Sequence, residues 1–282
     1  MNQRHFIFLL AGLTLLVSGC SSKFAYNNLD WMLYWYIDDF IELDKNQKQQ
    51  LDVKIDSWHA WHRTNELRVY RQHLEDLKAQ VKTADLNTAQ WLLHFDRGRS
   101  HWQRIRDQII PELSVMAIQL SDQQIVTLFD KLEKDNQEAI EERNEDTLEE
   151  RITNSKTRTK KQIQEWTGKL SKHQIAIIND YQDQYQSTFE AWIEYRRTMQ
   201  SEFKQLMLSR HKIDSFQTKF TNLLSDPDRY RSADYLRANQ HNRNVFASML
   251  AEIMPTLTNK QQKKVINEID DLIDDIDDLI ED

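Results

Sequence analysis

Leu170-Ser171-Lys172-His173-Gln174 belongs to a set of five stretches with one pattern, a leucine, a helix-capping residue, two variable residues and a glutamine. The other four are Leu43-Asp44-Lys45-Asn46-Gln47, Leu86-Asn87-Thr88-Ala89-Gln90, Leu120-Ser121-Asp122-Gln123-Gln124 and Leu257-Thr258-Asn259-Lys260-Gln261. In such a capping box the cap side chain accepts a hydrogen bond from the backbone N–H three residues later, and the glutamine accepts one from the N–H of the cap. We therefore interpret the five stretches as helix starts and not as binding sites.

Turn-forming residues are scarce, and this supports a helical fold. The whole sequence has four glycines and three prolines, whereas 29% of its residues are charged and 39% are hydrophobic. A many-stranded sheet needs frequent turns, and a phosphate-binding loop needs glycines. The composition is typical of amphipathic helices. We predict an all-α fold, an elongated bundle of about seven or eight helices, as a single domain over 20–282 because no linker-like stretch divides it.

Further signals divide the chain between the five boxes. Thr147 with Glu150 forms another capping signal, so we expect a break near 144–147. Apolar residues at helical spacing predict a helical segment over 171–208 and shorter helices over 214–225, 232–253 and 259–280. Pro111 predicts a kink or a restart. The boxes are separated by unequal intervals, which argues against a regular solenoid.

The N-terminus has the order of parts found in an export signal. Arg4 supplies a positive charge, and an apolar run follows that is too short to span a bilayer as a free helix. Val17-Ser18-Gly19-Cys20 then resembles the bacterial lipobox, an aliphatic residue and two small ones before a cysteine. We predict that 1–19 is a lipoprotein signal peptide and that Cys20, the sole cysteine, carries the lipid. The alternative is an ordinary cleaved signal with an incidental cysteine.

This anchor predicts where the protein is located. In the bacterial sorting rule that the anchor resembles, an aspartate after the cysteine retains a lipoprotein in the inner membrane, and here that residue is Ser21. We expect an outer-membrane lipoprotein facing the periplasm, with the inner membrane as the alternative. A single acylated thiol leaves no disulfide framework. Export and a net charge of -8 argue against a nucleic-acid partner.

Several stretches resemble a known family. Tyr26-Asn27-Asn28-Leu29-Asp30-Trp31, with Trp35, Asp38-Asp39-Phe40 and Leu43 to Gln47, resembles the opening of the proteobacterial lipoproteins grouped as domain of unknown function 6279. Trp58-His59-Ala60-Trp61-His62-Arg63, Gln119 to Ile125 and Trp166-Thr167-Gly168-Lys169-Leu170 extend the likeness. The resemblance implies a lipoprotein with a helical body and implies no activity.

A weaker resemblance is to the small periplasmic chaperones named for Leu-Thr-x-x-Gln motifs. Leu257-Thr258-Asn259-Lys260-Gln261 matches that motif literally, and the other four boxes replace the threonine. A capping box explains the pattern without shared ancestry. The likeness implies a tethered chaperone as an alternative function.

His59, His62 and Glu66 are the weak candidates for a metal site. They lie on one helical face at i, i+3 and i+7, and two imidazoles with a carboxylate suit zinc. Their spacing is not that of a metalloprotease helix, so we favour a histidine pair at the edge of the core. We predict no metal, cofactor or catalytic residue, and a metal-dependent enzyme is the least favoured alternative.

Two segments are candidates for contact with other molecules. The first is an aromatic cluster shortly after the anchor, which suits either a membrane interface or core packing. We favour packing because acidic residues follow directly. Whether these aromatic side chains touch the membrane stays open. The cluster comprises Trp31, Tyr34, Trp35, Tyr36 and Phe40. The second is 268–282, where a narrow apolar stripe alternates with acids and suits a partner helix.

These observations predict a function class without an activity. We expect a lipid-anchored, non-enzymatic envelope lipoprotein that binds another protein or has a structural role in the periplasm. The pattern leaves the identity of its partner and its oligomeric state open.

Overall fold

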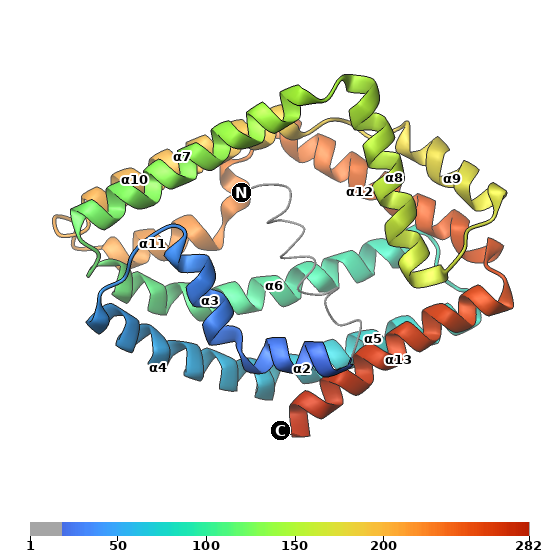
Figure 1. Ribbon diagram of the computed structural model, residues 1–282, viewed down its shortest axis with the longest axis horizontal. Helices are drawn as coiled ribbons and strands as arrows, with labels where there is room; N and C mark the ends of the chain where they lie inside the picture. Colours follow the sequence, from blue (N-terminus) through green and yellow to red (C-terminus); the bar gives the residue numbers. More distant parts are fainter. Residues whose placement is uncertain (1–18, 282) are drawn as a thin grey trace. The chain divides into compact units, whose positions relative to one another are not determined.

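The computed structural model of the chain describes residues 19–281 (Figure 1). Within that range the chain forms helices and no β-strand, which confirms the all-α prediction. The helices are α2 (Gly19–Asn27), α3 (Leu29–Asp38), α4 (Lys45–Trp61), α5 (Leu67–Thr83), α6 (Thr88–Ala117), α7 (Asp122–Glu145), α8 (Leu148–Thr167), α9 (Lys172–Gln182), α10 (Phe189–Leu208), α11 (Phe216–Ser225), α12 (Ala233–Ile253) and α13 (Asn259–Glu281). The signal segment predicted over 1–19 lies outside this range except for Gly19.

All five predicted helix starts are confirmed. Helices α4, α6, α7, α9 and α13 each begin one residue after the cap of a box. In each box the cap side chain accepts from the glutamine N–H, and the glutamine side chain accepts from the cap N–H. The sixth signal is also confirmed, because α8 begins after Thr147 and its capping box includes Glu150. Local hydrogen bonds therefore begin these six helices.

The described residues contain more helices than the seven or eight expected. Two short helices, α2 and α3, precede the first box. The segment 171–208 is divided, since α9 ends at Gln182 and α10 begins at Phe189. The loop between them is held from a distant helix: the side chain of Asn242 on α12 accepts from the N–H of Gln186 at 2.9 Å and donates to its carbonyl at 2.8 Å. Such a tertiary contact has no local sequence signal. At Pro111 the helix α6 continues.

A π-helical segment, His62–Glu66, connects α4 to α5. Two side chains in it bond to backbone carbonyls of the preceding turn. Thr64 donates to the carbonyl of Ala60 at 2.9 Å, and Asn65 donates to that of Trp61 at 3.0 Å. Side chains that compete for carbonyls in this way disturb the regular i to i-4 ladder.

The chain divides into two compact units, and each is assembled from separate segments. Within the described range, unit 1 comprises 19–66, 101–141 and 189–232, and unit 2 comprises 67–100, 142–188 and 233–281. The sequence suggests one body because no linker-like stretch marks a boundary. Of the five boundaries, two fall inside α6 and α7, and the other three fall at the starts of α5, α10 and α12.

Unit 1 has two hydrophobic clusters. The larger one joins α7, α10 and α11 to the C-terminal half of α6, and in Figure 1 the labels of α7 and α10 mark its two long helices. Its aromatic members meet edge to face, with ring centroids of Phe129 and Phe203 5.6 Å apart and those of Phe203 and Phe220 5.3 Å apart. The smaller cluster comprises Leu51, Ile55 and Trp58 of α4, with residues of α3 and α6 packed against it. Burial of these side chains is the main stabilising contribution.

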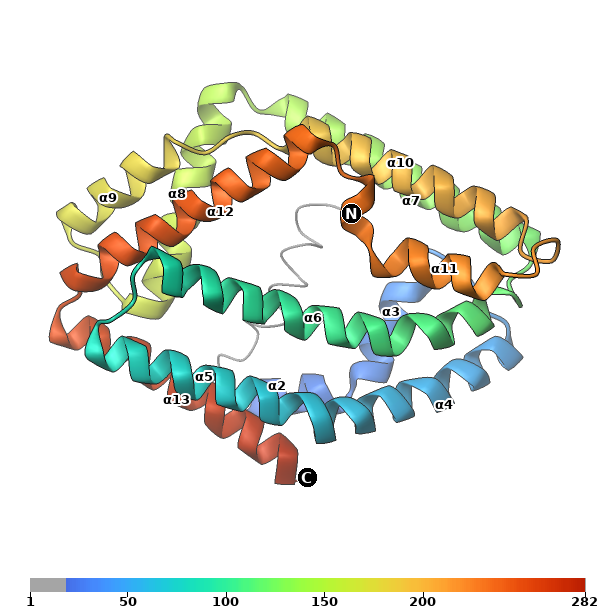
Figure 2. The same cartoon turned by 180° about the vertical axis from the view of Figure 1, so that it is seen from behind.

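Unit 2 is built around the antiparallel neighbours α5 and α13, which lie side by side in both views (Figure 2). The apolar stripe of α13 is buried, and Ile269 and Ile273 contact a cluster that includes Val81 at the end of α5. A second cluster joins α8, α9 and α12 through Ile163, Ile178 and Met249. Across 19–281 no helix has the length and apolar character needed to cross a bilayer.

Candidate functional site

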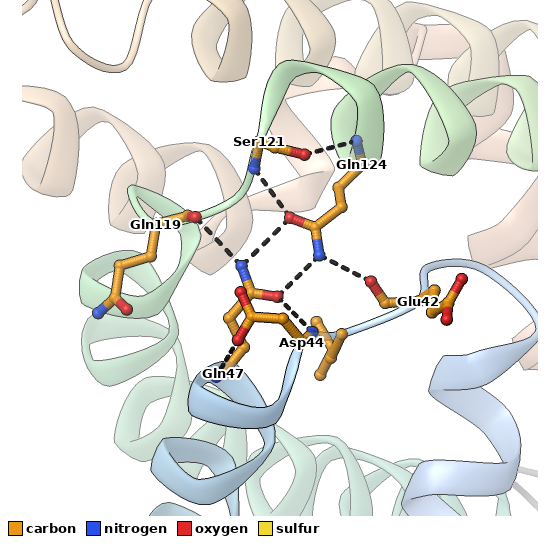
Figure 3. A pocket seen from close by; sticks show the side chains of 7 residues that line it. Glu42, Asp44, Gln47, Gln119, Ser121 and Gln124 are labelled. Carbon is orange, nitrogen blue, oxygen red and sulfur yellow. Dashed lines mark hydrogen bonds between the residues drawn. The ribbon is translucent and has the colours of Figure 1, made fainter.

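The most distinctive polar arrangement in unit 1 is a pair of box glutamines, of which Gln47 is buried and Gln124 is half-buried (Figure 3). Gln47, at the start of α4, and Gln124, at the start of α7, bond to each other through both side-chain amides, at 3.2 and 2.7 Å. The remaining N–H of Gln47 donates to the carbonyl of Gln119 at 3.1 Å, and that of Gln124 donates to the carbonyl of Glu42 at 2.7 Å. Each acceptor is the residue directly before the leucine of the other box.

Unit 2 repeats this arrangement with different residues. Gln174 of α9 and Gln261 of α13 bond to each other at 3.1 and 3.0 Å. Gln174 also donates to the carbonyl of Thr256 and Gln261 to that of Lys169, each at 3.1 Å. Both acceptors again precede the leucine of the opposite box. We call each arrangement a glutamine clasp.

The fifth box is not part of a clasp. Within residues 19–281, the structure gives Gln90 its two bonds with the cap Asn87 and no bond to another box glutamine. The pattern Leu-cap-x-x-Gln therefore predicts a helix start at every occurrence, whereas pairing depends on which two boxes the fold brings together.

A pocket of about 300 Å³ lies beside the clasp of unit 1. Two of its polar side chains already cap helices: the Asp44 carboxylate accepts from the N–H groups of Asn46 and Gln47, and the Ser121 hydroxyl accepts from that of Gln124. Figure 3 shows these groups directed at one another around the clasp. A catalytic pocket needs a nucleophile or an acid–base group that is available to a substrate. The geometry supports a structural joint.

Two of the weak metal candidates, His59 in the last turn of α4 and His62 at the start of the π-helical segment, lie against the ring of Tyr26. His62 Nδ1 is 2.9 Å from the hydroxyl of Tyr26, and the ring of Tyr26 lies 4.5 Å from that of His59, measured between centroids. Burial lowers the pKa of His62 to about 4. Burial also lowers the pKa of His59. Both imidazoles are therefore neutral near pH 7.

Glu66 does not face these histidines as a third ligand. Its carboxylate is 3% exposed and accepts three hydrogen bonds from the guanidinium of Arg104, the shortest at 2.7 Å. Arg104 also contacts Nδ1 of His101 at 2.7 Å. A bidentate arginine satisfies the carboxylate in the way that a metal would. Across 19–281 no group of three or more histidine, cysteine, aspartate or glutamate side chains has an arrangement that would hold a metal ion.

The aromatic cluster of residues 31–40 divides between two environments. Tyr34 packs against the α4 cluster and donates to the carbonyl of Lys48 at 2.9 Å, and Phe40 lies beneath the ammonium group of Lys131, 5.7 Å from the ring centroid. The packing prediction holds for these two. It is wrong for Trp31 and Trp35, which are 66% and 73% exposed, because they lie on the side of α3 that faces away from α4. Tyr36 is exposed to a smaller extent.

The C-terminal stripe predicted for a partner helix is buried within unit 2. Ile269, Ile273 and Ile276 belong to the face of α13 that packs on α5. Ion pairs flank this contact, with Arg71 of α5 at 2.6 Å from Asp277 and Lys78 at 2.9 Å from Asp270. A partner could therefore reach only the acidic outer face of α13.

A histidine pair in unit 2 has no local sequence signal. The rings of His73 on α5 and His94 on α6 are stacked, and Nε2 of His73 is 2.9 Å from Nδ1 of His94. Nε2 of His94 lies 3.2 Å from the side-chain oxygen of Gln80. Burial lowers the pKa of His94, which favours its neutral form. The side-chain oxygen of Gln80 can only accept, so Nε2 of a neutral His94 donates to it and Nδ1 accepts from Nε2 of His73.

One protein family matches most of this helical body. Residues 39–236 match a family described as a family of unknown function, DUF6279. The match covers more than half of the chain. This chain belongs to the DUF6279 family. In this DUF6279 protein the matched range contains four of the five boxes, whereas Cys20 and the box at 257–261 lie outside it. No curated protein and no solved structure matches the chain.

Proposed function

We propose that this DUF6279 protein is a lipid-anchored, non-enzymatic lipoprotein of the bacterial outer membrane whose helical body faces the periplasm and binds or supports another protein. The observation that carries the proposal is Val17-Ser18-Gly19-Cys20 after a short apolar run, with cysteine at no other position. A mature lipoprotein has three acyl chains, and these hold a protein at a membrane far more firmly than one chain.

The polar groups of the helical body support a binding or structural role. The glutamine clasps, the Glu66–Arg104 pair and the histidine contacts are directed at other parts of the same chain. These contacts hold helices in fixed positions, and none presents an activated nucleophile to a pocket. A fixed helical surface suits protein recognition.

Lipid attachment is tested on the purified membrane-extracted protein by mass spectrometry of its N-terminal peptide. We expect a peptide that starts at Cys20 and carries the mass of the acyl chains. Cys20→Ala should abolish acylation and leave residues 1–19 attached. A matched control, Ser22→Ala, should be acylated and processed normally. An unmodified Cys20 in the mature protein would refute the proposal.

The outer-membrane location has its own test at Ser21. Ser21→Asp places an aspartate directly after the lipidated cysteine, and the sorting rule then predicts retention in the inner membrane. We expect membrane fractionation on a density gradient to show the parent protein with the outer membrane and Ser21→Asp with the inner membrane. A parent protein found with the inner membrane would contradict this location.

Protein binding through the outer face of α13 is tested with charge-neutral variants. Asp271, Asp274 and Asp278 are exposed and follow one another at helical spacing. Replacing all three by asparagine leaves the buried stripe intact. We expect in-cell crosslinking of the parent to trap one or few proteins, and the triple variant to reduce their yield. Equal yields for parent and variant would rule out this face as the binding surface.

A tethered chaperone is the second candidate, and one surface feature favours it. Val53 of α4 and Val115 of α6 are exposed and line a shallow groove of about 390 Å³ in unit 1, together with Met116. Exposed apolar side chains of this kind can bind unfolded segments. We would expect the protein to suppress aggregation of a model client and Val53→Ser with Val115→Ser to weaken that effect. A protein inert in this assay is not a chaperone of this type.

A further inference from the structure

Helices α2 and α3 present large apolar side chains to solvent at the start of the mature chain. Phe24 of α2 and Trp31, Met32 and Trp35 of α3 are all exposed. Trp31 and Trp35 are separated by four positions and therefore lie on one face of α3. Tryptophans exposed to this extent forgo much of the stabilisation that burial of their large apolar area would contribute.

The opposite face of α3 is firmly packed on the body of unit 1. Leu33, Tyr34 and Ile37 pack against the cluster of Leu51, Ile55 and Trp58 on α4. The hydroxyl of Tyr34 is also 2.6 Å from a carboxylate oxygen of Asp52. Contacts on this face fix the rotation of α3 about its axis. The exposure of Trp31 and Trp35 is thus a property of the folded unit and not of an undocked helix.

Two of the acids near this face are paired with cations of the body. Asp38, the last residue of α3, is 3.4 Å from Lys48, and Asp39 is 3.0 Å from Lys131. The carboxylate of Asp44 caps α4. Asp30 lies on the other side of α3, roughly 100° around the helix from Trp31 and 140° from Trp35. These ion pairs and the cap reduce the electrostatic repulsion that the carboxylates would have with anionic headgroups if the aromatic face lay against a lipid surface.

We propose that the exposed face of α2 and α3 lies in the headgroup region of the membrane that holds the lipid of Cys20. This inference rests on the proposed lipid attachment. Trp31 and Trp35 follow Cys20 by 11 and 15 residues, which correspond to about 17 and 23 Å at the rise of a helix. Tryptophan is enriched at membrane interfaces, where the ring contacts acyl chains and the indole N–H stays hydrated. The aromatic face orients unit 1 on the bilayer, and the acyl chains supply the attachment.

The test uses the fact that Cys20 is the sole cysteine and would be blocked by acylation. Trp31→Cys and Trp35→Cys each introduce one reactive thiol for an environment-sensitive fluorophore. Val53→Cys is the matched control, because Val53 is an apolar residue of unit 1 with the same 66% exposure as Trp31. The full-length lipoproteins are reconstituted into phosphatidylethanolamine–phosphatidylglycerol vesicles, with and without phospholipid brominated near the headgroup. Circular dichroism verifies that each variant is folded.

We expect brominated lipid to quench the fluorophore at positions 31 and 35 and to leave position 53 unquenched. Equal, low quenching at all three positions in vesicle-bound protein would overturn the proposal. A fluorophore at 35 that is shielded from water but unquenched would also overturn it, and would assign the face to a protein partner or a second copy. Failure of lipid attachment gives a separate result, because the parent protein would then react with the thiol reagent at Cys20.

Discussion

The side-chain amide of Gln174 makes four hydrogen bonds, and three of them reach residues more than eighty positions away along the chain. Its oxygen accepts from the N–H groups of Ser171 and Gln261, and its nitrogen donates to Thr256 and Gln261. The side chain is fully buried. Each hydrogen bond of a buried amide contributes little net stability, but removing the amide takes away the bonds that its buried partners make with it.

Gln174→Ala and Gln90→Ala separate the two roles of a box glutamine. Both changes remove a capping bond, which costs about 1 kcal/mol. Gln174→Ala also leaves the amide of Gln261 and the carbonyl of Thr256 without this partner, for a total loss of about 2–4 kcal/mol in the free energy of unfolding. Urea denaturation of both variants measures the difference. Equal losses would show that the clasp contributes nothing beyond the cap.

His62 predicts a specific pH dependence of stability. Burial lowers its pKa in the folded protein to about 4, whereas the unfolded value is 6.5. The unfolded state therefore binds more protons between these pH values, so stability rises with pH across this window. The contribution is fully present above pH 6.5 and is lost as the pH falls towards 4, by an amount on the order of 3 kcal/mol.

The measurement compares urea unfolding at pH 7 and pH 4.5 for the parent, for His62→Gln and for the control His173→Gln, whose histidine is exposed. Carboxylates also titrate in this range, so the difference between variants carries the information. We expect His62→Gln to lose less stability on acidification than the parent, and His173→Gln to behave like the parent. A parent and a His62→Gln variant with the same pH slope would contradict the prediction.

At the scale of an element, α13 shows how one amphipathic pattern suits two different partners. A narrow apolar stripe flanked by acids fits a partner protein and fits a neighbouring helix of the same chain equally well. The structure places α5 against it, and Ile269 and Ile273 are nearly inaccessible to solvent. The acids near the C-terminal end oppose the helix dipole. Packing on α5 and the pair of Arg71 with Asp277 offset this effect.

Neighbouring substitutions on α13 test this packing. Ile273→Ala should lower the free energy of unfolding by about 2–4 kcal/mol, because it removes buried methyl groups and leaves a cavity. Asp274→Ala changes the adjacent exposed residue and should alter stability by no more than about 0.5 kcal/mol. Thermal or urea unfolding measures both. A small effect of Ile273→Ala would mean that the C-terminal helix is not packed on α5 in solution.

At the scale of the whole molecule, each unit has its own clasp. The clasp of unit 1 joins boxes 77 residues apart, Gln47 to Gln124, and that of unit 2 joins boxes 87 residues apart, Gln174 to Gln261. Both link helix starts that are distant in sequence within a unit of three separate segments. Contacts between residues so far apart in sequence close long loops, which costs conformational entropy. They therefore form only when the rest of the unit is folded.

Hydrogen exchange tests the independence of the two clasps. Gln47→Ala should speed amide exchange in the first turns of α4 and α7, and Gln174→Ala should do so in the first turns of α9 and α13, because each change releases only its own pair of helix starts. Mass spectrometry of peptic fragments resolves these regions. Faster exchange in both units after a single substitution would show that the clasps are coupled.

Several features of the protein follow from local sequence alone. Six helix starts, at Asp44, Asn87, Ser121, Thr147, Ser171 and Thr258, were predicted from residues three positions apart, because a capping box closes hydrogen bonds within one turn. Scarcity of glycine and proline predicted the all-α class for the same local reason. The expectation of lipid attachment at Cys20 likewise depends on adjacent residues only, and it stays a prediction.

The tertiary structure decided everything that depends on residues far apart in the chain. Identical local patterns at Gln90 and Gln174 differ in role, since only one of them meets another box. The outward direction of Trp31 and Trp35 depends on which face of α3 packs on α4. The loop at 183–188 depends on Asn242, and Glu66 depends on Arg104. Hydrogen bonds within one turn are specified by neighbouring residues, whereas burial and pairing require the positions of all helices in a unit.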